Sequence, residues 1–112
     1  MKIHYKRKSI NIFVKKVSDF ERFSGLMFRS KETMNLLFDF PYYTNMSLHS
    51  WFVFFPFLAV WLDKKNNVLD FKIVKPFCLS VNSKKIYRKF IEIPLNTRNK
   101  KIIKFFRRKG KI

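Results

Sequence analysis

The chain has 112 residues, 47% of them hydrophobic and 15 of them phenylalanine, and its 25 lysine and arginine residues against 7 acidic residues give a formal net charge of +18. This length fits one domain over residues 1–112 and leaves no room for a second domain core, while the apolar content argues against a wholly disordered chain. The positive charge favours a polyanionic partner such as nucleic acid or an anionic surface, but it fits equally well with lysine enrichment in a gene rich in A and T.

The N-terminal region alternates apolar and polar residues and predicts two strands, at residues 2–8 and 10–17. A capping box at residues 18–21 then predicts the start of a helix, because Ser18 and Glu21 can each accept a hydrogen bond from the other's backbone N–H. Gly25 suits the left-handed residue that ends many helices. We therefore expect one short helix near 19–24.

The middle of the chain is rich in aromatic and β-branched residues, which favour pleated, half-buried segments bounded by prolines. A polar turn at residues 64–67 separates two of these strands. In the second one, Leu69, Phe71 and Ile73 are expected on one face of the sheet. The expected strands are residues 35–40, closed by Pro41, residues 48–55, residues 57–63, the alternating strand after the turn, and residues 86–93.

The C-terminal segment 98–112 is strongly basic. Its basic residues recur at helical spacing with Ile102, Ile103 and Phe106 on the other side, which predicts either a basic amphipathic helix or a short helix near 97–106 followed by a last strand. We expect this segment to be removable without unfolding the domain. Its candidate polyanion-binding residues are Arg98, Lys100, Lys101, Lys104, Arg107, Arg108, Lys109 and Lys111.

Membrane insertion and disulfide formation are both disfavoured. The apolar run at residues 51–62 is interrupted by Pro56 and is shorter than the roughly 20 residues that a spanning helix needs. The N-terminus lacks the continuous apolar segment of a signal peptide. Cys78 is the single cysteine, so no intramolecular disulfide can form. We expect a soluble, cytoplasmic protein with no transmembrane segment.

Several short motifs follow one another in a fixed order along residues 10–95. An arginine, Gly-Leu-Met and a second arginine come first, then an apolar strand, an aromatic strand before a proline, a hairpin, and a glutamate in the last long strand. The motifs occupy residues 22–29, 36–41, 49–56, 62–63, 75–77 and 90–94. Together they resemble the domain-of-unknown-function 192 family. The resemblance implies a mainly-β fold, a single-domain sandwich or half-open barrel with one short helix, and it implies no activity.

Two positions depart from the pattern of that family. The family has an aspartate two residues after the proline, where this chain has Leu58. It also has a glycine soon after the last strand, where this chain has Leu95 and Asn96. A function that depended on the aspartate would be missing here.

The sequence predicts no catalytic residues, no metal site and no cofactor. A nucleophilic site needs a cysteine or serine beside a histidine, and a structural metal site needs closely spaced ligands. His4, His49 and Cys78 lie in separate segments without such spacing.

Four residues remain as candidates for ligand binding. Arg22 and Arg29 could hold a carboxylate or phosphate by bidentate contacts, or they could tie the predicted helix to the sheet. Glu92 lies in an apolar strand, so it either points to water or pairs with a base such as those arginines, in a structural rather than a catalytic role. His49 lies in an aromatic segment, where a half-buried imidazole with a polar partner is expected.

Three functions follow as hypotheses. The first is a non-catalytic binding or structural domain whose ligand is unidentified. The second is a basic protein that associates with nucleic acid, or rests on an anionic membrane surface, through residues 98–111. The third and weakest is a hydrolase-like enzyme, for which only Glu92, His49 and Arg22 could be offered.

Overall fold

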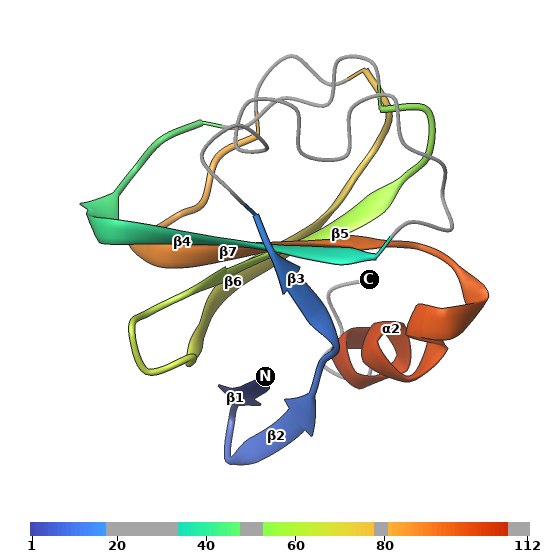
Figure 1. Cartoon of the computed structure of the whole chain (residues 1–112), viewed down its shortest axis with the longest axis horizontal. Coiled ribbons are helices and arrows are strands. Elements are labelled where there is room, and N and C mark those ends of the chain that lie inside the picture. Colours follow the sequence, from blue (N-terminus) through green and yellow to red (C-terminus); the bar gives the residue numbers. More distant parts are fainter. Residues whose placement is uncertain (18–33, 48–52, 78–80, 108–112) are drawn as a thin grey trace.

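The protein is mainly β, as the sequence predicts. A computed structural model of the chain describes residues 1–17, 34–47, 53–77 and 81–107 (Figure 1). The elements in chain order are β1 (Lys2–Tyr5), β2 (Lys8–Asn11), β3 (Val14–Lys16), β4 (Asn35–Thr44), β5 (Phe57–Leu62), β6 (Val68–Val74), β7 (Tyr87–Pro94), the 3-10 helix η1 (Thr97–Asn99) and α2 (Lys100–Arg107). No helix in these ranges is both long and apolar enough to cross a membrane.

Five of the strands form one open sheet in the order β3-β4-β7-β5-β6. β7 lies at its centre and pairs antiparallel with β4 and with β5, while β6 pairs antiparallel with β5 at one edge. β3 pairs parallel with β4 at the other edge. Because the two edge strands do not pair with each other, the described part of the chain forms no closed barrel.

Strand β5, which lies between β7 and β6, is buried along its whole length, as its uniformly apolar sequence predicts. Successive side chains of a strand point to opposite faces, so β5 contributes to two hydrophobic clusters. The first core contains Val17, Leu36, Phe38, Val53, Phe55, Phe57, Ala59, Trp61, Val74, Val81, Tyr87 and Phe90. The second core contains Ile3, Ile12, Leu58, Val60, Leu62, Phe71, Ile91, Ile93, Ile102 and Phe106.

The second core is covered by two elements from opposite ends of the chain. The β1–β2 hairpin contributes Ile3, and the C-terminal helix α2 contributes Ile102 and Phe106. Both elements lie on the same side of the sheet (Figure 1). The expectation that segment 98–112 is a removable tail is therefore wrong for α2, because removing it would expose the apolar surface that its side chains cover.

The turn between β5 and β6 ties the β1–β2 hairpin to the five-stranded sheet. The Asp63 carboxylate accepts hydrogen bonds from the backbone N–H groups of Lys65 and Asn67, both at 2.9 Å, and from the Asn67 side chain at 3.0 Å. The backbone N–H of His4 in β1 donates to the carbonyl of Asn66 at 2.9 Å. The polar turn predicted at residues 64–67 is confirmed, and it also holds the hairpin in place.

The N-terminal strands differ from their predicted bounds. The predicted strand 2–8 ends at Tyr5, because Lys6 and Arg7 adopt positive φ angles of 47° and 67° and form a tight turn. The predicted strand 10–17 is two strands, β2 and β3, which belong to different sheets.

Two other strand predictions also need correction. β4 continues past Pro41 to Thr44, and the proline is accommodated where pairing with β7 shifts register between Asp39 and Thr44. Residues 53–56 are not a strand, although Val53 and Phe55 are buried. The helix predicted near 19–24 and residues 48–52 lie outside the described residues.

The alternating strand, β6, contains an irregularity that its sequence does not reveal. Its register with β5 shifts between Trp61 and Leu62. As a result, Leu69 packs against the first core and Phe71 belongs to the second core. The prediction that these two side chains share one face is therefore wrong.

Candidate functional site

The start of the C-terminal helix is fixed to the end of β7 by two asparagines. Asn96 has an extended conformation, and its side chain caps η1 by accepting from the backbone N–H of Asn99 at 3.1 Å. Asn99 is only 5% exposed, and its Nδ2 donates to the carbonyl of Pro94 at 2.7 Å. These bonds set the direction in which α2 leaves the sheet.

The apolar side of α2 anchors it to the second core. Phe106 is fully buried, with its ring centroid 4.6 Å from that of Phe71 and 6.4 Å from that of Tyr5. Ile102, one turn earlier, is also buried. Both alternatives that the sequence left open include a helix here, and α2 is that helix, with its apolar side facing the protein interior. Residues 108–112, where the alternatives differ, lie outside the described residues.

The other side of the helix carries exposed cations. Within the part of the chain that the structure describes, no hydrogen bond or ion pair engages the side chains of the four basic residues of α2. We call the following exposed set the basic face: Arg98, Lys100, Lys101, Lys104 and Arg107. Arg98 does take part in a polar contact.

A depression of about 780 Å³ lies along this helix, and we call it the basic hollow. Its lining includes Asn96, Thr97, Lys100, Ile103, Lys104 and Arg107, and it includes no acidic residue among those described. Three cations around an open hollow with an amide and a hydroxyl group are suited to binding phosphate or carboxylate oxygens. The sequence identified the cations, whereas Asn96 and Thr97 were missed; the asparagine two residues after Pro94 could have been read as a helix N-cap.

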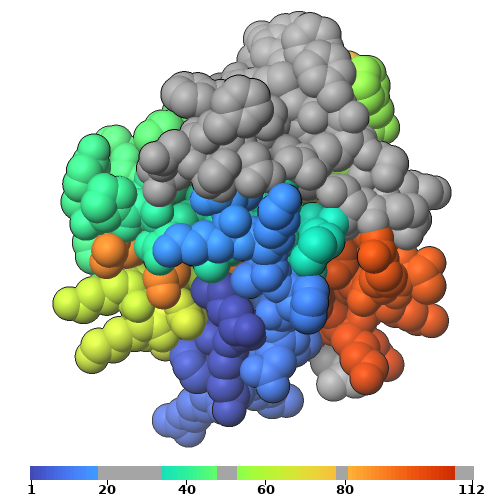
Figure 2. Space-filling view, in the orientation of Figure 1, coloured from blue at the N-terminus to red at the C-terminus, as the bar shows by residue number. Residues whose placement is uncertain are grey.

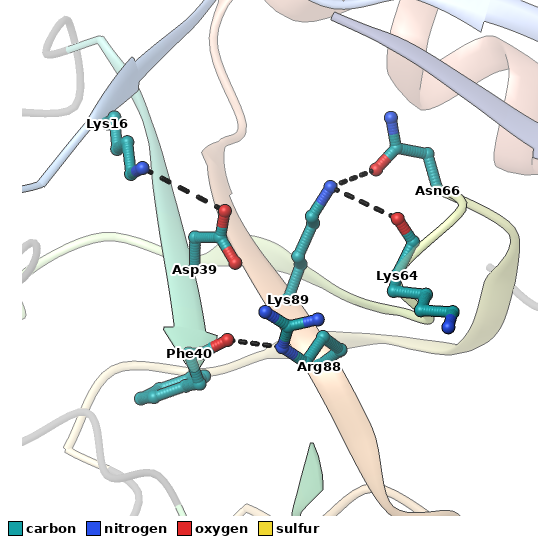
Figure 3. A network of polar contacts seen from close by, with 7 residues as sticks. All are labelled: Lys16, Asp39, Phe40, Lys64, Asn66, Arg88 and Lys89. Carbon is teal, nitrogen blue, oxygen red and sulfur yellow. Dashed lines mark hydrogen bonds and ion pairs between the residues drawn. The ribbon is translucent and has the colours of Figure 1, made fainter. Parts of the chain in front are cut away.

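Several other basic residues have acceptors within the protein itself. Lys89 Nζ lies 2.8 Å from Asn66 Oδ1 and 3.5 Å from the Lys64 carbonyl, and Arg88 donates to the carbonyl of Phe40 (Figure 3). Lys16 lies 3.9 Å from the Asp39 carboxylate. These cations are partly occupied by acceptors of the protein itself, so the basic face of α2 is the better candidate for an external anion.

The sequence offers four candidate ligand-binding residues, and the structure describes one of them, Glu92. It is 9% exposed, lies in β7 between Leu36 of β4 and Ala59 of β5, and is not without a partner. The alternative that it points to water is therefore wrong. Arg22, Arg29 and His49 lie outside the described residues, as do the basic residues Arg108, Lys109 and Lys111.

The described residues contain no group of three or more histidine, cysteine, aspartate or glutamate side chains that could hold a metal ion. None of the described acidic residues lines the basic hollow. Asp39 and Asp63 serve an ion pair and a turn, and the buried Asp70 accepts from the backbone N–H groups of Phe71 at 2.9 Å and Lys84 at 3.1 Å.

Two solved structures share this fold. A protein of Sinorhizobium meliloti 1021, described as a putative transcription regulator, is 17% identical with a TM-score of 0.71, and the match covers 90% of this chain and 81% of that chain. A protein of unknown function from Novosphingobium aromaticivorans DSM 12444 is 12% identical with a TM-score of 0.64, covering 84% and 69%. At these identities the likeness shows the fold alone.

A search of curated proteins finds no match to this chain. A family model does match it, over residues 3–105, which includes β2 to β7 and most of β1 and α2. The model is that of DUF192, described as an uncharacterized ACR, and it confirms the family that the ordered motifs resembled. The chain belongs to the DUF192 family.

Proposed function

We propose that this chain is a non-catalytic binding domain that associates with nucleic acid through the basic face of α2. The observation that carries the proposal is the orientation of this helix. Its apolar side chains Ile102 and Phe106 are buried, and its cations are exposed around the basic hollow. Clustered lysine and arginine side chains are the electrostatic footprint of phosphate binding.

The orientation of α2 also favours nucleic acid over a membrane surface. An amphipathic helix that lies on a membrane buries its apolar side among the lipids. Here Ile102 and Phe106 are already buried in the second core. Insertion into lipid would require the helix to leave the sheet, whereas phosphate binding uses the side that already faces solvent.

A hydrolase-like activity receives no comparable support. Glu92, the described member of the residues offered for it, stands on the same face of the sheet as Leu36 and Ala59 of the first core. The basic hollow lies along α2, which covers the opposite face. The carboxylate and the hollow therefore do not form one site.

A salt titration with charge-matched variants tests the proposal. Binding of the full chain to a labelled nucleic acid is measured by anisotropy at increasing salt. The triple variant Lys100→Ala, Lys104→Ala, Arg107→Ala should bind more weakly and reduce the slope of log affinity against log salt by about 2 to 3, because each of the three lost phosphate contacts removes about 0.7 to 0.9. Deleting segment 98–112 is not suitable, since it would also remove Phe106 from the second core.

The control removes the same charge elsewhere. Lys65, Lys84 and Lys85 are exposed residues in the β5–β6 turn and in the segment before β7. Their triple alanine variant has the same net charge as the α2 variant. Equal losses in the two variants would mean that binding follows net charge alone and would overturn the proposal. Binding to anionic vesicles but not to nucleic acid would overturn it as well.

A further inference from the structure

A second hollow lies on the other side of the start of α2. It has a volume of about 450 Å³, within the range of small-molecule sites, and its lining includes Phe13, Met34, Asn35, Arg98, Asn99 and Lys101. We call it the Phe13 hollow. It combines an aromatic ring, an aliphatic side chain, buried amides and two cations, whereas no aromatic residue is among the described residues that line the basic hollow.

We infer that the nucleic acid bound by this domain is single-stranded, and that one unstacked base occupies the Phe13 hollow while neighbouring phosphates contact the basic face. This inference rests on the proposed function and names its ligand class. Four features of the Phe13 hollow support it.

The first feature is Phe13 itself, which is 80% exposed although most of the large apolar side chains that the structure describes are buried. Its backbone is held firmly. The preceding residue, Ile12, is buried in the second core, and the Phe13 carbonyl accepts from Asn35 Nδ2 at 3.0 Å. A ring held at the surface in this way is a stacking platform for a base.

The second feature is a buried acceptor on Asn35. This side chain is 6% exposed, and its amide donates to the Phe13 carbonyl and to Asn99 Oδ1 at 2.9 Å. A carbonyl oxygen can only accept, so the donor must be Nδ2 and the amide orientation is fixed. Oδ1 is then left buried with no hydrogen-bond partner. An amino or imino N–H of a base would satisfy it once neighbouring side chains move aside, because the atom itself has almost no accessible surface.

The third feature is the proximity of the two hollows. Asn96 lines both of them, and the basic face borders both, with Arg98 and Lys101 on one side and Lys100 and Lys104 on the other. Residues of the β2–β3 corner, the start of β4 and α2 meet on one face of the molecule (Figure 2). A strand crossing the start of α2 could therefore place a base in one hollow and phosphates in the other.

The fourth feature is the presence of an aromatic ring and a hydrogen-bond acceptor in one hollow, which favours a single strand over a duplex. A duplex keeps its bases stacked and would leave both Phe13 and the Asn35 acceptor unused. A single strand exposes base faces and base edges to an aromatic ring and to an acceptor. Phosphate contacts alone would need neither residue.

The test compares three probes on the full chain: a labelled single strand, its duplex, and inorganic polyphosphate, which has charge but no bases. We expect the single strand to bind most tightly. Phe13→Ala should weaken single-strand binding roughly tenfold or more, because loss of one base–aromatic stack has an effect of that size. Phe13→Ala should leave polyphosphate binding unchanged. Phe13→Trp, which keeps an aromatic ring at this position, should bind the single strand about as tightly as the wild type.

Phe54→Ala is the matched control, since Phe54 is also an exposed phenylalanine, at 59%, and it should not change binding. If the single strand binds no better than the duplex, or if Phe13→Ala has no effect on it, the inference is overturned while the proposed function stands. A loss of polyphosphate binding in Phe13→Ala would also overturn it, because the ring would then be structural. If none of the probes binds, the proposed function fails together with the inference.

Discussion

The two faces of the sheet are closed by different kinds of side chain, although one strand, β5, contributes to both. On the first face Trp61 packs against Tyr87 and Phe90, with ring centroids 6.4 and 5.5 Å apart. On the second face Leu58, Val60 and Leu62 form an aliphatic layer that is covered by the β1–β2 hairpin and α2. Both hollows are lined by residues next to or within the elements that cover the second face. Substitutions that disturb these elements should therefore change both the stability of the fold and the binding of a ligand.

The largest expected effect comes from replacing Leu58, on this second face, with the aspartate that the family pattern has at this position. Leu58 is fully buried in the second core. Leu58→Asp would bury a carboxylate among aliphatic side chains, which costs several kcal/mol unless the group is paired or neutralised. We expect the variant to be unfolded, or to have a strongly lowered midpoint in urea.

Its control is the residue paired with it on the neighbouring strand. Ile73 of β6 pairs with Leu58 but is 36% exposed. Ile73→Asp should therefore have a much smaller effect on the urea midpoint. A Leu58→Asp variant as stable as the Ile73→Asp variant would show that Leu58 is not part of a closed second core.

The next effect concerns the helix that closes this core. Phe106→Ala removes a fully buried ring and should lower the free energy of unfolding by about 3–5 kcal/mol. Phe13→Ala, at an 80% exposed position, should change it by no more than about 0.5 kcal/mol. Chemical denaturation of both variants checks the contrast. Similar stabilities would mean that α2 is a dispensable tail after all.

The sequence predicts the parts of this fold that depend on local pattern. The continuous apolar run of β5, the polar turn after it and the helical spacing of the basic residues each have a clear period or a clear turn signal. The family motifs add the order of these elements. What the pattern of α2 cannot show is which surface its apolar side meets, because Ile102 and Phe106 would look the same on a membrane or on a sheet.

The missed features depend on contacts between distant residues or on backbone conformations without a sequence signal. The β1–β2 turn uses Lys6 and Arg7 at positive φ, where asparagine and glycine are the usual signal. The Phe13 hollow depends on Asn35, which lies 22 residues from Phe13 and 64 from Asn99. Neither separation could be read from the sequence.

A smaller effect distinguishes the aromatic face by its response to alkaline pH. Burial raises the pKa of Tyr87 from its ordinary value of 10.0 to about 12. Above pH 10 the phenol ionises in the unfolded chain but not in the folded one, so the stability of the wild type should fall as the pH rises from about 10 to about 12. Tyr87→Phe should lose this part of the pH dependence.

At neutral pH the same variant should lose about 1 kcal/mol, because the Tyr87 hydroxyl donates to the Met46 carbonyl at 2.7 Å. Urea titrations at neutral and alkaline pH measure both quantities. Identical alkaline slopes in the wild type and in Tyr87→Phe would mean that the hydroxyl is accessible to solvent, contrary to its place in the first core.

The smallest expected effect concerns the turn that ties the hairpin to the second face, and it should be seen in acid. Partial burial by itself would raise the pKa of Asp63, but hydrogen bonds from Asn67 and Lys65 and the charge of Lys65 together lower it below its ordinary value of 3.8. A lowered folded-state pKa contributes stability that is complete above 3.8 and is lost as the pH falls through the folded-state value. Asp63→Asn should therefore be less acid-sensitive than the wild type, which urea titrations at low pH measure. Asp39→Asn, which changes a carboxylate of β4 outside this turn, is the control for the exchange measurement. Because the backbone N–H of His4 donates to the carbonyl of Asn66 in this turn, amide exchange at His4 should speed up in Asp63→Asn and not in Asp39→Asn. Unchanged exchange at His4 in both variants would show that the hairpin is held by the second core alone.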